Sequence, residues 1–295
     1  EGITLKAILR KKEDNDSSET KKWSKLTYEF KRPSSSAISE FAPLNTFYAA
    51  GRKLQIDQVD LVSSNITSWR LCPNCAHAEI EIDGNHTASC PECGSPAWAD
   101  KGQIRSMLKA NLVYSNMNDN DSHIDDASDD RKTIFYNKQL LVDIDDEKDI
   151  EKAYEMNNNE FHFGFEYVKK AIIREINFGE AQLSGEKLFV GGVESIRKGF
   201  KICKYCGKIQ TDDNKPLHTY SCKVKNSPVN SGDYENCLFL YRELSTEALR
   251  LLIPATTLVS EGTKVESFEA AFMLGMKEYF GNVEHLRTCI CEAPV

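Results

Sequence analysis

The sequence predicts a strand-rich α+β fold with short helices, and three observations lead to it. Eight of the ten cysteines fall into two groups, at 72–93 and 203–237. Short apolar segments rich in β-branched and aromatic residues alternate with glycines and polar stretches, as in sheet proteins. The clearest helical stripe is confined to residues 267–280. Because paired Cys-x2-Cys turns commonly bind zinc between hairpin tips, we expect two zinc-ribbon-like modules within this fold.

The N-terminal elements follow from apolar segments and their breaks. ITLKAIL (3–9) and LTYEF (26–30) are strand-like, and the polar residues 11–25 between them indicate a loop or a hairpin tip. Residues 36–41 favour one or two helical turns, which Pro43 would end. The chain therefore begins with extended segments and a single short helix.

The later elements are mainly strands. Residues 52–62 alternate between apolar and polar, which is typical of a strand, with a bulge expected near Gln58. Glycines punctuate the apolar residues 161–192, which predicts a meander, although 166–176 also fits helical spacing. SFEAAFMLGMKEYF (267–280) predicts the clearest helix.

Charge divides the chain unevenly. Residues 119–155 carry thirteen acids against five bases, whereas 197–225 carry eight bases against two acids. The stretch 115–133 is too polar to build a core and indicates a flexible or surface connection. It lacks the Gly and the final Glu of an EF-hand loop, so we set a calcium site aside. The expected domains are 1–113 with the first cysteine group, 114–158 as an acidic connection, and 159–295 with the second group.

The first cysteine group has the spacing of a closed zinc site. Cys72 and Cys75 form one Cys-x2-Cys turn, Cys90 and Cys93 form another, and fourteen residues separate the turns. Two such turns complete a tetrahedron of thiolates and leave no position for an activated water, so the role should be structural. A disulfide pair or an iron–sulfur cluster is the alternative.

The second group offers three cysteines and an open choice of fourth ligand. Its cysteines are Cys203, Cys206 and Cys222. His218 would complete an H-x3-C half, and Cys237 would complete an all-thiolate site. We favour Cys237, because a spare buried thiol is otherwise unexplained. Cys289 and Cys291 lack the usual spacing and are expected to be unligated. The chain should thus hold two structural zinc ions, each contributing on the order of 10 kcal/mol to folding.

Several function classes are not supported by any motif. No apolar run reaches the roughly 18 residues that span a bilayer, and no signal segment opens the chain, so we expect a cytoplasmic protein without a membrane partner. The sequence contains no G-x4-G-K-[ST], G-x-S-x-G or H-E-x-x-H motif. This stretch is therefore expected not to be an enzyme. Its first residue, Glu1, and its final CICEAPV suggest a piece of a longer polypeptide.

Two parts of the chain resemble a known family. RPSSSAISEFAP, GRKLQIDQVDL and WRLCPNCAHAEI…CPECG are similar to the region after the motor domains of large bacterial superfamily-two DEAD/DEAH-box helicases. GFKICKYCGKIQ…HTYSC…CLFLYRELSTEALRLLIP…FEAAFMLGMKEYFG resembles their C-terminal zinc-binding domain. That domain is named for the mitomycin-repair helicase and also occurs in phage-defence helicases such as those of DISARM and Druantia. The resemblance covers most of the chain, apart from 11–25 and 115–133.

The resemblance implies an accessory element of an ATP-dependent DNA helicase. The intact protein would translocate on or unwind DNA, and the partners would be DNA, the helicase's own motor domains and a subunit of a defence system. The family's metal ligands would correspond to Cys72, Cys75, Cys90 and Cys93, and to Cys203, Cys206 and Cys222. The motor motifs are absent from this chain, so the resemblance assigns no ATPase activity to it.

The basic segment provides a candidate DNA contact. Its members are Arg197, Lys198, Lys201, Lys204, Lys208, Lys223 and Lys225. Lysines and arginines neutralise phosphates, and the interleaved Phe200 and Tyr205 are candidates for stacking on bases. The alternatives are a solvated lysine face with both aromatics in the core, and a structural or protein-docking module that holds the motor or recruits a partner subunit. An independent nuclease is the least favoured hypothesis.

Overall fold

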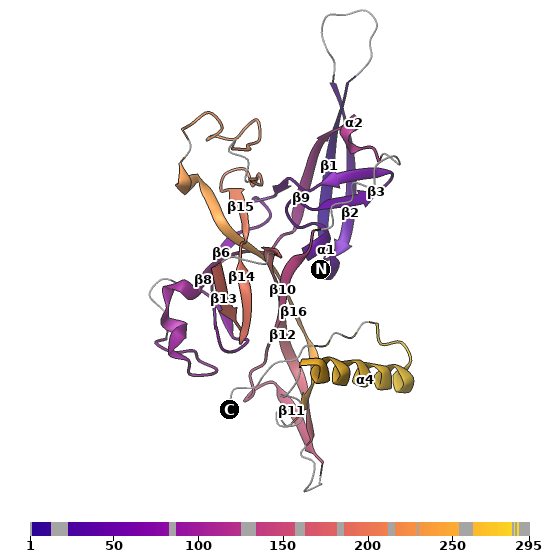
Figure 1. The fold of residues 1–295 in the computed structure, drawn as a ribbon, viewed down its shortest axis with the longest axis vertical. Coiled ribbons are helices and arrows are strands. Elements are labelled where there is room, and N and C mark those ends of the chain that lie inside the picture. The colour runs from indigo at the N-terminus through magenta and orange to yellow at the C-terminus, as the bar shows by residue number, and fades with distance from the viewer. Residues whose placement is uncertain are drawn as a thin grey trace, which may run out of the picture. The chain divides into compact units, whose positions relative to one another are not determined.

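A computed structural model confirms the strand-rich α+β fold (Figure 1). It describes residues 2–12, 23–82, 87–124, 134–156, 163–181, 186–211, 216–228, 230–253, 262–284, 286 and 288. The described strands are β1 (Gly2–Lys12), β2 (Trp23–Pro33), β3 (Thr46–Ala49), β4 (Arg52–Gln55), β5 (Gln58–Val59), β6 (Ile66–Leu71), β7 (Ala78–Ile80), β8 (Ile104–Leu108), β9 (Leu112–Asn118), β10 (Tyr136–Asp143), β11 (Ile150–Glu155), β12 (Gly164–Glu180), β13 (Glu186–Val190), β14 (Val193–Arg197), β15 (Phe200–Cys203) and β16 (Tyr234–Leu252). The described helices are α1 (Ser34–Glu40), α2 (Asp119–Ser122) and α4 (Gly262–Phe280), with 3-10 turns η1 (Pro96–Ala99), η2 (Lys101–Gln103) and η3 (Ser231–Asp233).

The N-terminal sheet has the strand order β2-β1-β9-β5. β1 and β2 pair antiparallel from Gly2↔Pro33 to Lys12↔Trp23, so the hairpin alternative is confirmed, with residues 13–22 outside the described part. β9 pairs with β1 in parallel. Every second residue of β1 enters the main core, and α1 adds Ala37 and Ile38 to the same cluster. This alternation fixes which face of the hairpin is buried.

The second sheet carries both cysteine groups. Its order is β10-β12-β16-β8-β6-β7, with β11 also on β12 and β15 also on β16. β6 pairs antiparallel with both β7 and β8, and its last residue, Leu71, directly precedes the first cysteine turn. β15 ends at Cys203 and pairs with the start of β16. The first cysteine of each metal-binding group therefore lies at the end of a strand or directly after it.

Several elements differ from their sequence-based prediction. The single strand expected over 52–62 is two strands, β4 and β5, which belong to different sheets. A helix over 166–176 is wrong, because this stretch lies within β12, which is paired on both edges. The C-terminal helix is confirmed as α4, although it begins at Gly262. It ends at Phe280, and the next residue, Gly281, closes the last turn with a positive φ of 81° and an N–H bond to the Lys277 carbonyl (2.9 Å).

The polar stretch 115–133 is partly structural. Its first residues belong to β9, and Asp119 in α2 is only 6% exposed. The Asp119 carboxylate pairs with the Arg52 guanidinium at 2.7 Å, and Arg52 also donates to Ser122 Oγ at 2.9 Å. A surface connection is therefore the wrong description of 115–122, since a cation from β4 offsets the cost of burying this acid. Residues 125–133 lie outside the described part.

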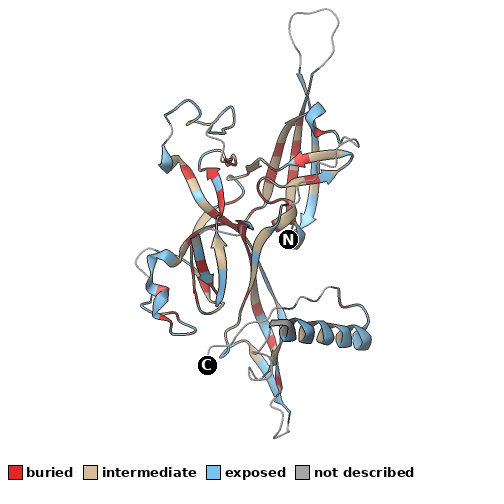
Figure 2. Ribbon diagram, viewed as in Figure 1, coloured by how far each residue is buried: buried red, intermediate tan, exposed pale blue. Residues whose placement is uncertain are grey.

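The chain divides into two compact units built from separate stretches. Unit 1 comprises Glu1–Gln139, Arg174–Arg242 and Pro294–Val295, and unit 2 comprises Leu140–Ile173 and Glu243–Ala293. The division predicted from the sequence, in contrast, is consecutive. Both metal groups belong to unit 1. In unit 2, α4 is largely exposed (Figure 2). None of the helices in the described ranges is long and apolar enough to cross a membrane.

Candidate metal centres

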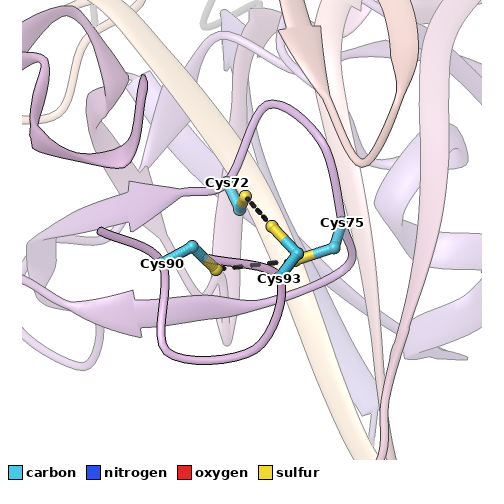
Figure 3. A group of neighbouring side chains, drawn as sticks. All are labelled: Cys72, Cys75, Cys90 and Cys93. Atoms are coloured by element: carbon cyan, nitrogen blue, oxygen red, sulfur yellow. Dashed lines mark hydrogen bonds between the residues drawn. The ribbon is translucent and has the colours of Figure 1, made fainter. Parts of the chain in front are cut away.

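The first cysteine group is arranged to hold a metal ion (Figure 3). The sulfur atoms of Cys72, Cys75, Cys90 and Cys93 all lie within 4.8 Å of one another. The Cys72–Cys93 and Cys75–Cys90 sulfur pairs are each 3.6 Å apart. Zinc–sulfur bonds of about 2.3 Å in a tetrahedron place sulfurs about 3.8 Å apart, whereas a disulfide places them about 2 Å apart. All four thiols are free, so this group does not contain the disulfide pair that we considered as an alternative.

Backbone hydrogen bonds in two short turns orient these thiols toward one another. The Cys72 N–H donates to the His77 carbonyl at 3.0 Å, and the Cys90 N–H donates to the Ser95 carbonyl at 3.0 Å. The Gly94 N–H returns to the Cys90 carbonyl at 2.9 Å, with Gly94 at a φ of 70°. A glycine adopts this left-handed conformation without the cost that a Cβ brings. Each turn therefore points two sulfurs to one side.

The buried side chain of Arg70 connects the segments that surround the first centre. Trp98 is fully buried and packs with Cys72 and Cys90. The Arg70 guanidinium is 1% exposed and makes two hydrogen bonds to the Glu81 carboxylate, at 2.8 and 3.0 Å. It also donates to the Trp98 carbonyl at 2.6 Å and lies over the Trp98 ring. A bidentate pair of this kind fixes the segment after β7 to the strand that leads into Cys72.

A glycine hairpin covers the first cysteine turn. β13 and β14 pair antiparallel up to Val190↔Val193, which leaves a two-residue loop. Gly191 and Gly192 have φ values of 58° and 79°, as a type I′ turn requires. Their N–H groups donate to the carbonyls of Cys72 (2.9 Å) and Pro73 (2.8 Å). The tip is therefore bonded to the metal-binding turn itself.

The second group comprises Cys203, Cys206, His218 and Cys222, whose ligand atoms also lie within 4.8 Å of one another. The Cys203 and Cys222 sulfurs are 3.8 Å apart. His218 Nδ1 lies 3.5 Å from the Cys222 sulfur and 3.9 Å from the Cys206 sulfur. His218 Nε2 lies 3.1 Å from the Tyr234 hydroxyl. A ligating histidine commonly bonds a neighbour through its other nitrogen, and Tyr234 serves that purpose here.

Cys237, which we favoured as the fourth ligand, lies outside this group. It sits on β16, where its sulfur would be only 2.8 Å from a Cβ built on Gly199. The thiol thus packs over Gly199 rather than toward the other three sulfurs. The structure places His218, the alternative ligand, in the fourth position. Cys289 and Cys291 are outside the described residues.

The second centre is anchored to the N-terminal sheet. The Cys203 N–H donates to the Lys208 carbonyl and the Gly207 N–H to the Cys203 carbonyl, both at 2.9 Å, as in the Cys90 turn. The Val59 N–H donates to the Gly207 carbonyl at 2.9 Å, and Lys208 forms an ion pair with Asp57. A Cβ on Gly207 would lie 1.9 Å from the Val59 carbonyl oxygen. This close approach requires glycine.

The crowded thiols perturb one another. The hydrogen bond from Cys75 lowers the pKa of Cys72 to about 5, and the same contact raises the pKa of Cys75. Burial raises the pKa values of Cys90 and Cys203 to about 12. Ionisation of Cys72 therefore opposes ionisation of Cys75, and burial opposes ionisation of Cys90 and Cys203. A bound cation removes this conflict, because metal ligation stabilises every thiolate at once.

The candidate DNA-binding cations fall into two sets. Lys198, Lys204 and Lys208 are paired with acids, namely Glu180 (2.7 Å), Glu235 (3.8 Å) and Asp57, respectively. Lys201, Lys223 and Lys225 instead lie over the rings of Tyr234, Tyr205 and Tyr220, at 5.5, 4.4 and 4.7 Å from ring centroids. The side chain of Arg197 is not among those described. Phe200 is 6% exposed and belongs to the core, so it is not a stacking residue.

Comparison with protein-family models, curated proteins and solved structures found no significant match to this chain. The shared geometry of the two centres, rather than homology, therefore supports a metal-stabilised domain. The closed sets of four protein ligands agree with a structural metal.

Proposed function

We propose that this chain is a zinc-stabilised DNA-binding accessory region of an ATP-dependent DNA helicase, with a role in DNA repair or phage defence. Zinc is the metal preferred by tetrahedral sets of four thiolates, or of three thiolates and one imidazole. The helicase context rests on the sequence resemblance alone. We place the protein in the cytoplasm, where thiols stay reduced and available to a metal.

The observation that carries the DNA-binding proposal is the set of lysines over tyrosine rings. Lys201, Lys223 and Lys225 surround the second centre, and no ion pair to a described acid engages them. Cations without a carboxylate partner remain able to neutralise phosphates and release counterions. The three ion-paired lysines contribute less, because an acid already compensates each of them.

The experiment is binding of the zinc-loaded chain to DNA across a salt series. We expect affinity to fall steeply with salt, and Lys223→Glu/Lys225→Glu to weaken binding and to flatten the slope by about 1.4 to 1.8 for two lost phosphate contacts. Lys169→Glu/Lys170→Glu is the matched control, since both lysines are exposed residues of β12 in unit 2. An unchanged slope in the first variant, with zinc content intact, would exclude this surface as the contact.

A structural or docking role is the second candidate, and unit 2 favours it. Unit 2 contains 17 acidic residues against 8 lysines and arginines, which repels DNA. In α4, Leu274, Tyr279 and Phe280 are 66%, 83% and 65% exposed. Exposed apolar side chains of this size often mark protein contacts. Under this alternative, the helicase's motor domains or a defence-system subunit would bind unit 2, and the zinc-loaded chain would show no salt-dependent DNA binding.

A further inference from the structure

Two tyrosines occupy equivalent places in the second centre. Tyr205 lies between the ligands Cys203 and Cys206, and Tyr220 lies between His218 and Cys222. Each tyrosine is thus within a turn whose two ends converge on the same metal position. A bound metal would fix the backbone on both sides of each tyrosine, so both turns would be held around one ion.

Both rings face solvent. Tyr205 is 45% exposed and Tyr220 is 91% exposed, whereas Tyr234 of the same region is 7% exposed. A tyrosine side chain that remains this exposed in a fixed turn adds little to the core, although burying a ring is strongly favourable. The exposed rings are therefore available for a ligand.

A lysine accompanies each ring. Lys223 Nζ lies 4.4 Å from the Tyr205 ring centroid, and Lys225 Nζ lies 4.7 Å from that of Tyr220. The Asp233 carboxylate lies near the Tyr205 hydroxyl, at the end of that ring. Each site therefore combines a neutral π surface with a positive charge a few ångströms away.

We propose that Tyr205 and Tyr220 form a stacking platform for the bases of single-stranded nucleic acid, with Lys223 and Lys225 on its phosphates. This inference rests on the proposed DNA-binding function and specifies its substrate class. Single strands offer unstacked bases that pack on aromatic rings, while adjacent cations follow the backbone. A duplex keeps its bases stacked on one another and presents phosphates only, so the tyrosines would add nothing to duplex binding.

The metal should be required for the platform. Without ligation, the turn carrying Tyr205 and the turn carrying Tyr220 are no longer joined through one ion, and ordering them costs conformational entropy on binding. Removing zinc should therefore abolish the preference for single strands, while the binding that depends only on charge should change less.

The test compares three probes on the full zinc-loaded chain: a dT15 oligonucleotide, a 15-base-pair duplex, and a 15-mer of abasic sites that keeps the phosphates. We expect the wild type to prefer dT15 over the abasic strand. Tyr205→Leu/Tyr220→Leu should lose roughly tenfold or more in dT15 affinity for each ring. Its duplex and abasic affinities should be unchanged. Tyr205→Phe/Tyr220→Phe, which keeps the π surfaces, should retain dT15 binding, and Tyr154→Leu, a 52% exposed tyrosine of unit 2, is the matched control.

The outcomes separate the two proposals. If the wild type binds none of the probes at low salt, the DNA-binding function itself fails. If it binds all three equally, or if the double leucine variant with full zinc content binds dT15 as the wild type does, the stacking platform is overturned while charge-driven DNA binding stands. Equal losses in the phenylalanine and leucine variants would also overturn stacking, because the hydroxyl would then be the contact.

Discussion

His218 uses its two ring nitrogens for different contacts. Nδ1 faces the cysteine sulfurs of the second centre, and Nε2 lies 3.1 Å from the Tyr234 hydroxyl. Gln210 supports this arrangement, because its side-chain amide exchanges two hydrogen bonds with the backbone of Leu217, at 2.8 and 2.9 Å. Leu217, the residue before His218, is thus held in place. This orients the imidazole so that Nδ1 faces the metal position.

We predict that His218→Ala reduces the metal content from two ions per chain to one, since three thiolates leave the second tetrahedron incomplete. Cys237→Ala should keep both ions, because this thiol packs over Gly199. Metal analysis after dialysis against a weak chelator measures both. If the histidine variant binds two ions and the Cys237 variant binds only one, Cys237 is the fourth ligand of the second centre and His218 is not.

Gly207 and Gly94 provide a matched pair for backbone strain. Both follow a cysteine turn with φ near 70°, but a Cβ on Gly94 meets nothing within 4 Å, whereas one on Gly207 meets the Val59 carbonyl. Gly94→Ala should cost about 1–2 kcal/mol for the left-handed conformation alone. Gly207→Ala should cost clearly more, because the bond to Val59 must also break. Urea unfolding of both zinc-loaded variants tests this order, and equal midpoints would contradict it.

At the scale of elements, the Arg70–Glu81 pair holds the first metal module. We predict that Arg70→Met destabilises the chain by about 3–5 kcal/mol, because Glu81, 12% exposed at its side chain, loses its cation. The exposed pair Lys6–Glu29 is the control, and Lys6→Met should cost at most about 1 kcal/mol. Chemical denaturation at saturating zinc compares them. A small loss in the Arg70 variant would mean that water already solvates the carboxylate.

The β13–β14 hairpin should report on the first metal. Its tip amides, Gly191 and Gly192, donate to carbonyls within the cysteine turn, so the turn must be ordered for them to be protected. We predict slow hydrogen exchange at these amides with zinc and fast exchange after chelation. Amides of the β1–β2 ladder should stay protected in both states. Protection of the tip that survives chelation would show that the turn keeps its shape without metal.

At the scale of the whole molecule, the two metal centres belong to one unit. Each ion is expected to contribute on the order of 10 kcal/mol to the stability of the part it holds, so chelation should unfold unit 1 around both centres. We predict a large fall in the thermal midpoint with a strong chelator, and full recovery on adding zinc. Protons compete for the thiolates, so acidification should release zinc as well. A midpoint insensitive to chelator would argue against structural metals.

Charge is also distributed by unit. The acidic excess of unit 2 and the lysines around the second centre predict that DNA contacts fall within unit 1. Photo-crosslinking of a thiothymidine oligonucleotide, followed by peptide mapping, should find crosslinks near Tyr205 and Tyr220 and none in α4. Crosslinks concentrated in unit 2 would contradict this assignment.

The sequence alone determined the strand-rich class and the first metal group, because those signals are local. Alternation of apolar and polar residues predicts a strand. Each Cys-x2-Cys turn brings its own two thiols together, whatever the rest of the fold is. The end of α4 before Gly281 is local in the same sense, because it depends on residues within a few positions of one another.

The tertiary structure decided what depends on distant partners. The pairing of β15 with β16 places Cys237 over Gly199 and leaves His218 to complete the second group. Lys208 meets Asp57 across 151 positions, which removes it from the free cations, and Arg52 buries Asp119. The spacing of residues in the sequence does not predict these contacts. The free energy of pairing charges and packing strands depends on which distant residues the fold brings together.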